Sequence, residues 1–211
     1  MVIRYNNPEW PELTFPKEEG EYVKAAYRRA NTILEYGSGG STKLAAELPG
    51  KRVFSVESDL LWAVRLQRRI DEIAKSPTYI HYVNIGRTGS YGRPINDEMW
   101  RHHYQYAASI WLLPFFSHPD VVLIDGRLRA ACFLFAGLSI TRPTTILFDD
   151  YAGRPAYHRI EHFAKPSELV GRMAVFELEQ PIQASPMALA CLLEFSGEMT
   201  YAGQPISYER S

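Results

Sequence analysis

The segment from Thr32 to Thr42 places an apolar run, a glycine-rich turn and the start of a helical pattern in direct succession. The run has the composition of a buried strand, and three glycines follow within the four residues from Gly37 to Gly40. Glycine has no Cβ and adopts unusual φ angles, so such a turn lets backbone N–H groups approach a ligand closely. The segment therefore predicts a strand–turn–helix unit of the nucleotide-binding kind.

Apolar runs and helical patterns alternate along the rest of the chain. We expect further strands at 52–56, 78–83, 119–124 and 144–148, and helices at 17–30, 41–48, 59–75, 96–113, 128–135 and 155–164. The last two apolar runs, 173–178 and 187–195, have only a proline-containing loop between them, so we expect an antiparallel strand pair. The pattern favours an α/β fold with a doubly wound, mostly parallel, seven-stranded sheet.

The length and composition of the chain narrow its class. With 211 residues, it is expected to form a single domain, in which residues 1–30 are a proline-containing lead-in followed by a helix. A net charge of −1 gives no reason to expect nucleic acid or an anionic membrane as partner. The N-terminus lacks the apolar region of a signal peptide, and the run 130–140 is too short to cross a membrane. We therefore expect a cytoplasmic protein.

Acidic residues follow four of the five expected parallel strands. In an open α/β sheet the ligand lies outside the carboxyl ends of the strands. Single acids at strand ends are common because they cap turns and helices, but their convergence on one edge suggests a site. The acids are Glu35, Glu57, Asp125, Asp149 and Asp150.

A dinucleotide-binding dehydrogenase is the first alternative for the glycine turn. Its G-x-G-x-x-G fingerprint would need glycine at position 42, where Thr42 stands. Glu57 lies about 20 residues beyond the first glycine and suits a ribose diol. Glu35, however, directly precedes the turn and would repel a pyrophosphate, whereas it suits an amino-bearing ligand. A dehydrogenase that uses NAD is therefore the least favoured function.

These residues resemble the first motif of class I S-adenosylmethionine-dependent methyltransferases, (D/E)-x-G-x-G, which matches Glu35-Tyr-Gly37-Ser-Gly39. The second-strand acid of that family matches Glu57, and the resemblance spans roughly residues 17–195. It implies a Rossmann-like fold in which Glu35, Gly37, Ser38 and Gly39 contact the methionine part of the cofactor. It also implies that Glu57 binds the ribose, and that Ser58 and the loop from Asn84 to Arg87 face the adenine.

A narrower resemblance links Asp125, Asp149 and Asp150 to metal-dependent small-molecule O-methyltransferases, including catechol and macrocin-type enzymes. There, acids at these strand ends bind Mg²⁺, and the resemblance assigns Asp125 and Asp149 to catalysis. Three hard oxygen ligands suit Mg²⁺, which lowers the pKa of a bound hydroxyl. Neither a lysine nor an acid stands near Arg127 where those enzymes carry one, so the general base is not identified. Alternatively, Asp149 and Asp150 cap the next helix and Asp125 contacts the amino group of the cofactor.

We therefore predict an S-adenosylmethionine-binding protein that methylates a small molecule at oxygen. A non-catalytic binding module of the same fold is the alternative, because no general base is evident. The sequence does not specify the acceptor, and it leaves open whether the protein forms a homo-oligomer.

Overall fold

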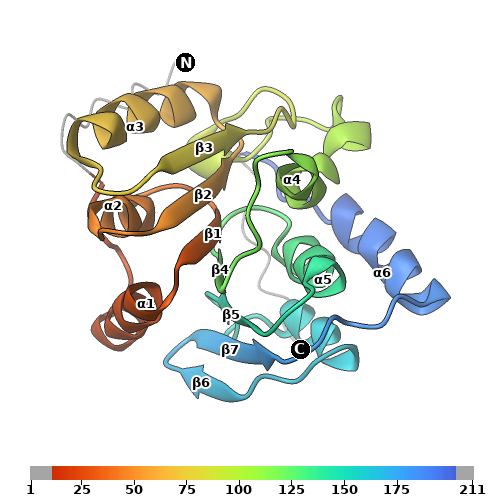
Figure 1. Cartoon of the computed structure of the whole chain (residues 1–211). Helices are drawn as coiled ribbons and strands as arrows, with labels where there is room; N and C mark the ends of the chain where they lie inside the picture. Colours follow the sequence, from red (N-terminus) through yellow and green to blue (C-terminus); the bar gives the residue numbers. More distant parts are fainter. Residues whose placement is uncertain (1–10, 203–211) are drawn as a thin grey trace.

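The computed structural model describes residues 11–202, which form one mixed sheet between two layers of helices (Figure 1). The order across the sheet is β3-β2-β1-β4-β5-β7-β6. The first five strands are parallel, whereas β7 is antiparallel to both β5 and β6. The predicted seven-stranded, doubly wound architecture is confirmed. The strands are β1 Thr32–Tyr36, β2 Arg52–Glu57, β3 Thr78–Tyr82, β4 Val121–Ile124, β5 Thr144–Phe148, β6 Glu168–Val170 and β7 Met173–Leu178.

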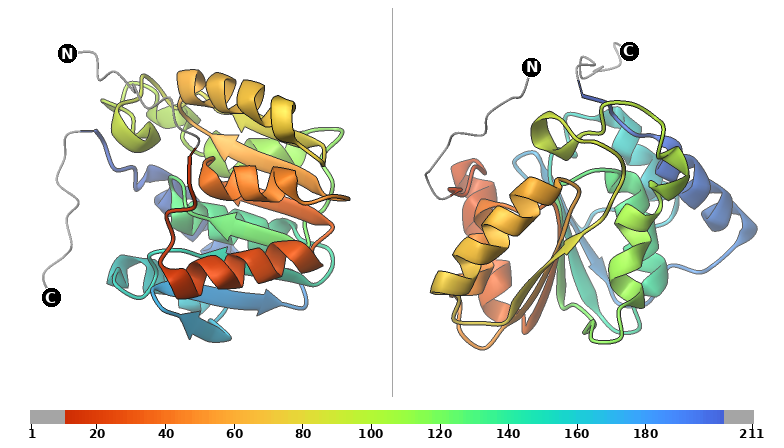
Figure 2. Two further views of the ribbon diagram at one scale, coloured as in Figure 1. Left: turned by 90° about the vertical axis from the view of Figure 1, so that its left-hand side faces the viewer. Right: turned by 90° about the horizontal axis from the view of Figure 1, so that it is seen from above.

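Helices cover both faces of this sheet, as Figure 2 shows from two further directions. On one face lie α1 Lys17–Arg29, α2 Gly40–Glu47 and α3 Leu60–Ile73, and on the other lie α4 Gln105–Ala108, α5 Arg129–Ser139 and α6 Pro186–Gly197. The short 3₁₀ helices are η1 Ser90–Gly92, η2 Trp100–His102, η3 Ser109–Leu112 and η4 Pro155–His162. None of the helices in the part of the chain described combines the length and apolar character needed to cross a membrane.

The alternation of side chains along each strand divides the core into two layers. In β4, Val122 and Ile124 pack with the cluster that includes α5, whereas Val121 and Leu123 pack with the cluster that includes α1. Because successive strand residues point to opposite faces, Glu35 shares the α1 face with Ile33. The position of an acidic residue along its strand, odd or even, thus determines on which face of the sheet its side chain lies.

The N-terminal lead-in crosses the start of α2. A Cβ atom on Gly40 would lie 2.6 Å from the backbone nitrogen of Leu13 and would also meet the backbone of Glu12. This glycine is therefore required by close packing of two backbones. Residues 11–16 form no helix or strand, which agrees with the predicted irregular lead-in. Residues 1–10 of that lead-in lie outside the described part of the chain.

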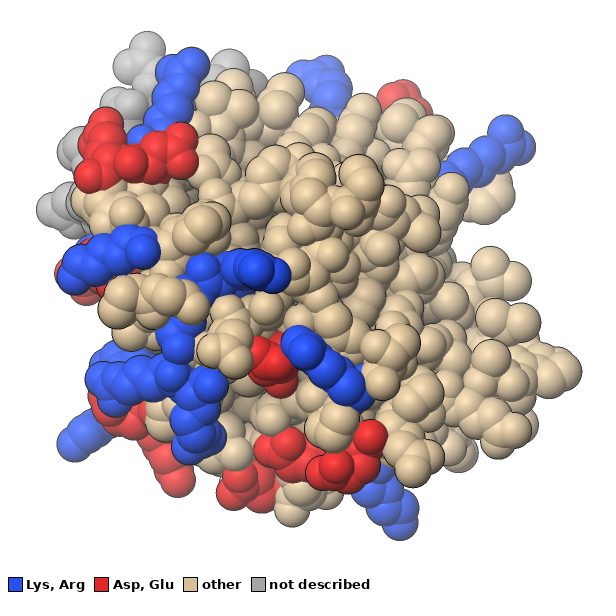
Figure 3. Space-filling model, in the orientation of Figure 1, with Lys and Arg blue, Asp and Glu red and all other residues tan. Residues whose placement is uncertain are grey.

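The expectation of a strand at 187–195 is wrong, because this segment is helix α6. The Ser185 side chain caps the helix by accepting a hydrogen bond of 3.1 Å from the Ala188 N–H, and Pro186 occupies the first turn. The run contains Met, Ala and Leu but no β-branched residue, so its intrinsic preference is helical. The antiparallel pair is instead β6 and β7. Exposed apolar side chains such as Leu193, 74% accessible, lie on α6, and few charged ones lie around it in Figure 3.

The continuous helix expected at 96–113 is also wrong. The segment forms η2, the single turn α4, and η3. Ser109 Oγ donates to the Gln105 carbonyl at 2.7 Å, a local bond that competes with regular helix. Trp100 is 60% and Tyr104 50% exposed, whereas Tyr106 and Ile110 are buried.

Candidate functional site

The glycine turn packs directly against the turn that follows β4. Gly37 has φ +100°, and a Cβ atom there would lie 2.9 Å from the backbone nitrogen of Gly126. The Asp125 N–H donates to the Tyr36 carbonyl at 2.9 Å, which joins the two strand ends. Gly37 is therefore required by the positive φ angle and by backbone contact, in addition to any approach of a ligand.

Glu35 lies beneath the glycine turn and is fully buried. Its Oε1 accepts a hydrogen bond of 2.6 Å from the Tyr27 hydroxyl, while Oε2 has no partner among the described residues. Burial raises the pKa of Glu35, although hydroxyls including that of Thr42 act in the opposite direction. An orphaned buried carboxylate oxygen beside the start of α2 fits a ligand that brings an amino group or a water to it.

Glu57 connects the end of β2 to the glycine turn. Its Oε1 accepts from the backbone N–H groups of Ser58 at 2.6 Å and Asp59 at 2.8 Å. Its Oε2 lies 3.4 Å from the backbone nitrogen of Ser38. Burial is the largest influence on this carboxyl and raises its pKa. The structure thus brings Glu57 and Ser38 together, as expected for two parts of one binding site.

The loop that carries η1 lies over Glu57. Ser58 Oγ donates to the Gly92 carbonyl at 2.8 Å, and a Cβ atom on Gly92 would lie 3.1 Å from Glu57 Oε1. Ala202 N–H in turn donates to the Pro94 carbonyl at 2.7 Å. The C-terminal part of this loop is therefore anchored at Gly92 and at Pro94.

A hollow of about 380 Å³ opens beside Ser58, between the start of α3 and this loop. Asn84 is exposed within it, and its Oδ1 accepts from the Gly86 N–H at 3.0 Å. Asp59, a lining residue, donates its N–H to Glu57 Oε1 at 2.8 Å, so the hollow adjoins the expected ribose position. The lining residues are Asp59, Leu60, Leu61, Tyr82, Asn84, Gly86, Arg87, Thr88, Glu98 and Met99.

Strained backbone gathers at the same edge of the sheet. The non-glycine residues with positive φ in the described part of the chain are Tyr91 at 59°, Leu128 at 49° and Asp150 at 58°. They lie in the loop over Glu57, after β4 and after β5, respectively. Such conformations cost about 1–3 kcal/mol each and are concentrated at functional sites. This edge is therefore the best candidate for the functional site.

Asp125, Asp149 and Asp150 do converge, and each offers an oxygen within 4.8 Å of the others. The buried guanidinium of Arg129 lies among them, with Nη2 2.8 Å from Asp125 Oδ1 and Nη1 3.2 Å from Asp150 Oδ2. Its Nη1 also donates to the Asp149 carbonyl at 2.7 Å. An arginine thus holds the position between the three carboxylates.

Two further arginines complete the neutralisation of these acids. Arg172 donates to both carboxylate oxygens of Asp149, at 3.0 and 2.9 Å, and Arg154 donates to Asp150 at 2.7 Å. A dication at this position would face the guanidinium of Arg129 and would have to replace its ion pairs. The donor set in this arrangement does not fit Mg²⁺.

The three acids differ in access. The Asp149 side chain is 1% exposed, whereas that of Asp125 is 36% exposed. Desolvation and the neighbouring carboxylates raise the pKa of Asp125 to about 7, although Arg129 acts in the opposite direction. Asp125 is therefore the acid of this cluster best placed to exchange a proton with a ligand near neutral pH.

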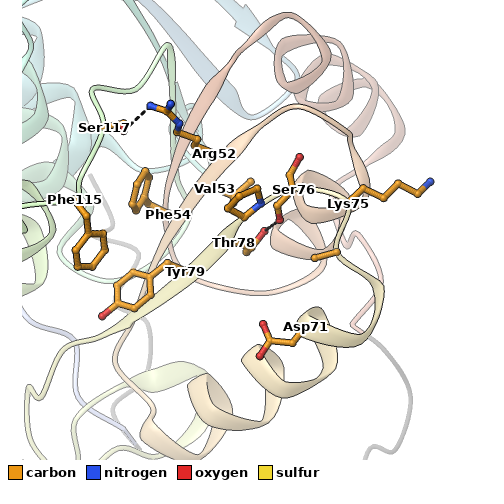
Figure 4. Close-up of a pocket in the computed structure, with 12 residues that line it drawn as sticks. Arg52, Val53, Phe54, Asp71, Lys75, Ser76, Thr78, Tyr79, Phe115 and Ser117 are labelled. Carbon is orange, nitrogen blue, oxygen red and sulfur yellow. Dashed lines mark hydrogen bonds between the residues drawn. The ribbon is translucent and has the colours of Figure 1, made fainter.

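A second, larger hollow of about 820 Å³ lies at the opposite edge of the sheet (Figure 4). It opens at the first residues of β2 and β3, and Phe54, Tyr79 and Phe115 line one side of it. Ligands of open α/β sheets bind at the carboxyl ends of the strands. The strained residues and the acids all lie at those ends, so this hollow is not the candidate site.

Several residues of the site were not expected from the sequence. Arg129 pairs with Asp125 four positions earlier, but Asp125 precedes helix α5, so the helical i,i+4 rule does not predict this pair. Arg172 lies in the turn between β6 and β7, and no local pattern links it to Asp149. Tyr106 was also missed: its hydroxyl occupies the space where a Cβ atom on Gly126 would project.

Comparison with known proteins agrees with this architecture. A methyltransferase-like protein from Silicibacter pomeroyi DSS-3 shares 44% identity and superposes with a TM-score of 0.84, over 89% of this chain and 98% of that one. No protein-family model and no curated protein matches the chain.

Two more distant structures share the fold. The cofactor-bound Rv0187 from MTB has a TM-score of 0.55 at 16% identity, over 82% of this chain and 84% of that one. A SAM-dependent O-methyltransferase from Thermotoga maritima has a TM-score of 0.50 at 8% identity, over 82% and 69%. The fold is that of the class I S-adenosylmethionine-dependent methyltransferases. Within that class, the chain belongs to the methyltransferase-like family of the Silicibacter protein.

Proposed function

We propose that this protein binds S-adenosylmethionine at the carboxyl edge of the sheet and methylates an oxygen of a small molecule. The observation that carries the proposal is the arrangement of Glu57, which accepts from the glycine turn at Ser38 and stands beside the hollow of about 380 Å³. This carboxylate would hold the ribose hydroxyls, with the adenine in the hollow beside Ser58 and Asn84. The turn at Gly37, Ser38 and Gly39 would receive the methionine part, with Glu35 beneath it.

The chemistry requires an electrophilic methyl group and a site that removes a proton from the acceptor. S-adenosylmethionine, when bound, supplies the methyl group on a positively charged sulfur. Asp125 is the partly exposed acid at this edge, with a pKa of about 7, and would accept the proton that a hydroxyl acceptor loses. Asp149 is buried and ion-paired, so its role is to position Arg129 and Arg172 rather than to contact substrate.

Binding of the cofactor tests the first part of this proposal. Isothermal titration with S-adenosylhomocysteine should show one site per chain, and Glu57→Gln should weaken binding at least tenfold because it removes the charge that binds the ribose. Absence of heat and of any thermal shift at millimolar ligand would refute the proposal. A shift of the melting temperature with NAD instead would favour the dehydrogenase.

A non-catalytic binding module is the second candidate. The observation in its favour is the acid cluster, whose carboxylates are neutralised by Arg129, Arg154 and Arg172 in place of a metal. Cofactor binding without methyl transfer to a broad panel of hydroxyl and amine acceptors would support it. Turnover of any acceptor would eliminate it, and loss of that turnover in Asp125→Asn would support the assigned base.

A further inference from the structure

Two arginines at this edge have no carboxylate partner among residues 11–202, unlike the three that pair with the acid cluster. Arg127 lies in the turn after β4, and its half-buried guanidinium makes no hydrogen bond or ion pair with any residue of 11–202. Arg93 belongs to the loop over Glu57, and its buried Nε has no partner among the same residues. The Arg93 guanidinium also lies 5.9 Å from the centre of the Tyr91 ring. A partly buried cation without an anionic partner is costly, so this arrangement calls for an explanation.

The surroundings of Arg127 are themselves cationic. Burial lowers the pKa of Arg127, and the charges of Arg129 and Arg93 lower it further. The hydroxyl groups of Tyr106 and Tyr157 lie close enough to act in the opposite direction. Tyr157 is itself bonded to Arg154, whose Nη1 donates to its hydroxyl at 3.2 Å. Among the described residues, the charged side chains that act most on Arg127 are thus the cations Arg129 and Arg93.

The backbone holds Arg127 in this position. Leu128, the next residue, is 7% exposed and has φ 49°, a conformation that a bulky side chain rarely adopts. Cys132 Sγ also donates to the Arg127 carbonyl at 3.3 Å. The unpaired guanidinium is therefore attached to a constrained turn, two residues after the partly exposed Asp125.

We propose that Arg127 and Arg93 bind an anionic group, a carboxylate or a phosphate, on the molecule that accepts the methyl group. The proposal rests on the methyltransferase function inferred above and names the chemical class of its acceptor. A guanidinium presents its N–H groups in a planar fork that matches both anions, and such charge-assisted bonds are the strong ones. An anion at this place would supply the missing acceptors and would bring the rest of the molecule beside Asp125.

The probes are sodium phosphate and sodium acetate, compared with sodium chloride at equal ionic strength and in the presence of saturating S-adenosylhomocysteine. Wild type is compared with Arg127→Gln, with Arg93→Gln, and with Arg101→Gln as a matched control. Arg101 is an exposed arginine over the ring of Trp100. We expect phosphate or acetate to raise the melting temperature of wild type and the control. We expect at least tenfold weaker anion binding in Arg127→Gln and weaker binding in Arg93→Gln.

A second readout separates binding from a structural role. Removal of an unpaired, half-buried charge should raise the melting temperature of Arg127→Gln above wild type when no anion is added. A lower melting temperature, or an unchanged response to both anions, would overturn the proposal. A tenfold loss of S-adenosylhomocysteine affinity in Arg127→Gln would also overturn it, because the guanidinium would then serve the cofactor carboxylate.

The proposed function and this inference fail in distinguishable ways. If wild type does not bind S-adenosylhomocysteine, the methyltransferase function is refuted, while the anion titration of the free protein still reports on Arg127. If the cofactor product binds normally and neither anion is sensitive to Arg127, only the anionic acceptor is refuted.

Discussion

Arg129 determines the arrangement of acids at the carboxyl edge of the sheet. Its side chain is 5% exposed and pairs with Asp125 and Asp150. Arg129→Gln leaves the carboxylates without their shared partner, which should cost about 3–5 kcal/mol in the free energy of unfolding. Urea unfolding at pH 7 measures this cost. Lys24→Gln, which removes an exposed pair with Glu21, should cost at most about 1 kcal/mol, and an equal effect of both changes would contradict the assignment.

The raised pKa of Asp125 makes a prediction about pH. The pKa of this carboxyl is about 7 in the folded chain, well above its ordinary value of 3.8. The folded state then binds the proton more tightly, so ionisation destabilises it progressively as pH rises from about 4 to about 7. Asp125→Asn removes the pH-dependent contribution of this carboxyl to the free energy of unfolding. The stability of the variant relative to wild type should therefore increase as pH rises across that interval. Urea unfolding at several pH values measures the difference, and a constant difference would show that the pKa is not raised.

Gly37 and Gly39 belong to one motif but are required for different reasons. Gly37→Ala introduces a side chain at φ +100° and within 2.9 Å of Gly126, so it should destabilise the protein by about 1–3 kcal/mol or more. A Cβ atom on Gly39 would meet nothing within 4 Å. Gly39→Ala should therefore fold normally, and any defect should appear in the affinity for S-adenosylhomocysteine. Thermal unfolding and titration of both variants would separate the two roles, and equal stability of the two would contradict the packing argument.

At the scale of elements, the loop with η1 lies over Glu57, on the proposed nucleoside side of the site. Ser58→Ala removes the hydrogen bond to the Gly92 carbonyl, which should cost about 0.5–1.5 kcal/mol. The amides of 86–93 should then exchange hydrogen faster, while those of β1 and β4 remain protected. Hydrogen exchange followed by mass spectrometry measures both. Unchanged exchange in the loop would show that other contacts hold it.

The elements that the sequence predicted well are those with strong local signals. Each of β1 to β5 is an apolar run bounded by turn residues, and the glycine turn after β1 precedes a helix where expected. The helix α6 was mistaken for a strand because length and apolar character alone do not distinguish a buried strand from a helix. The cap at Ser185, the proline after it and the absence of β-branched residues were the decisive signals. The segment around α4 does not form one continuous helix, because several of its backbone hydrogen bonds span three residues rather than four. One example joins the Tyr106 N–H to the His103 carbonyl.

At the scale of the whole molecule, the sheet brings together side chains that no local pattern links. The convergence of Asp125 with Asp149 followed from parallel strands ending at one edge, and this much was predictable. The pairing of Asp149 with Arg172 depends on the β6–β7 turn, 23 residues away along the chain. The sequence therefore located the acids but not the arginines that neutralise them. Because these arginines already neutralise the acids, the cluster no longer argues for a metal. The side chains left for contact with a ligand at this place are Asp125 and Arg127.

The most direct test of the account is titration of the wild-type protein with S-adenosylhomocysteine, followed by Glu57→Gln. We expect one binding site per chain, and at least tenfold weaker binding in the variant. Wild-type protein that binds neither S-adenosylhomocysteine nor S-adenosylmethionine at millimolar concentration would contradict it.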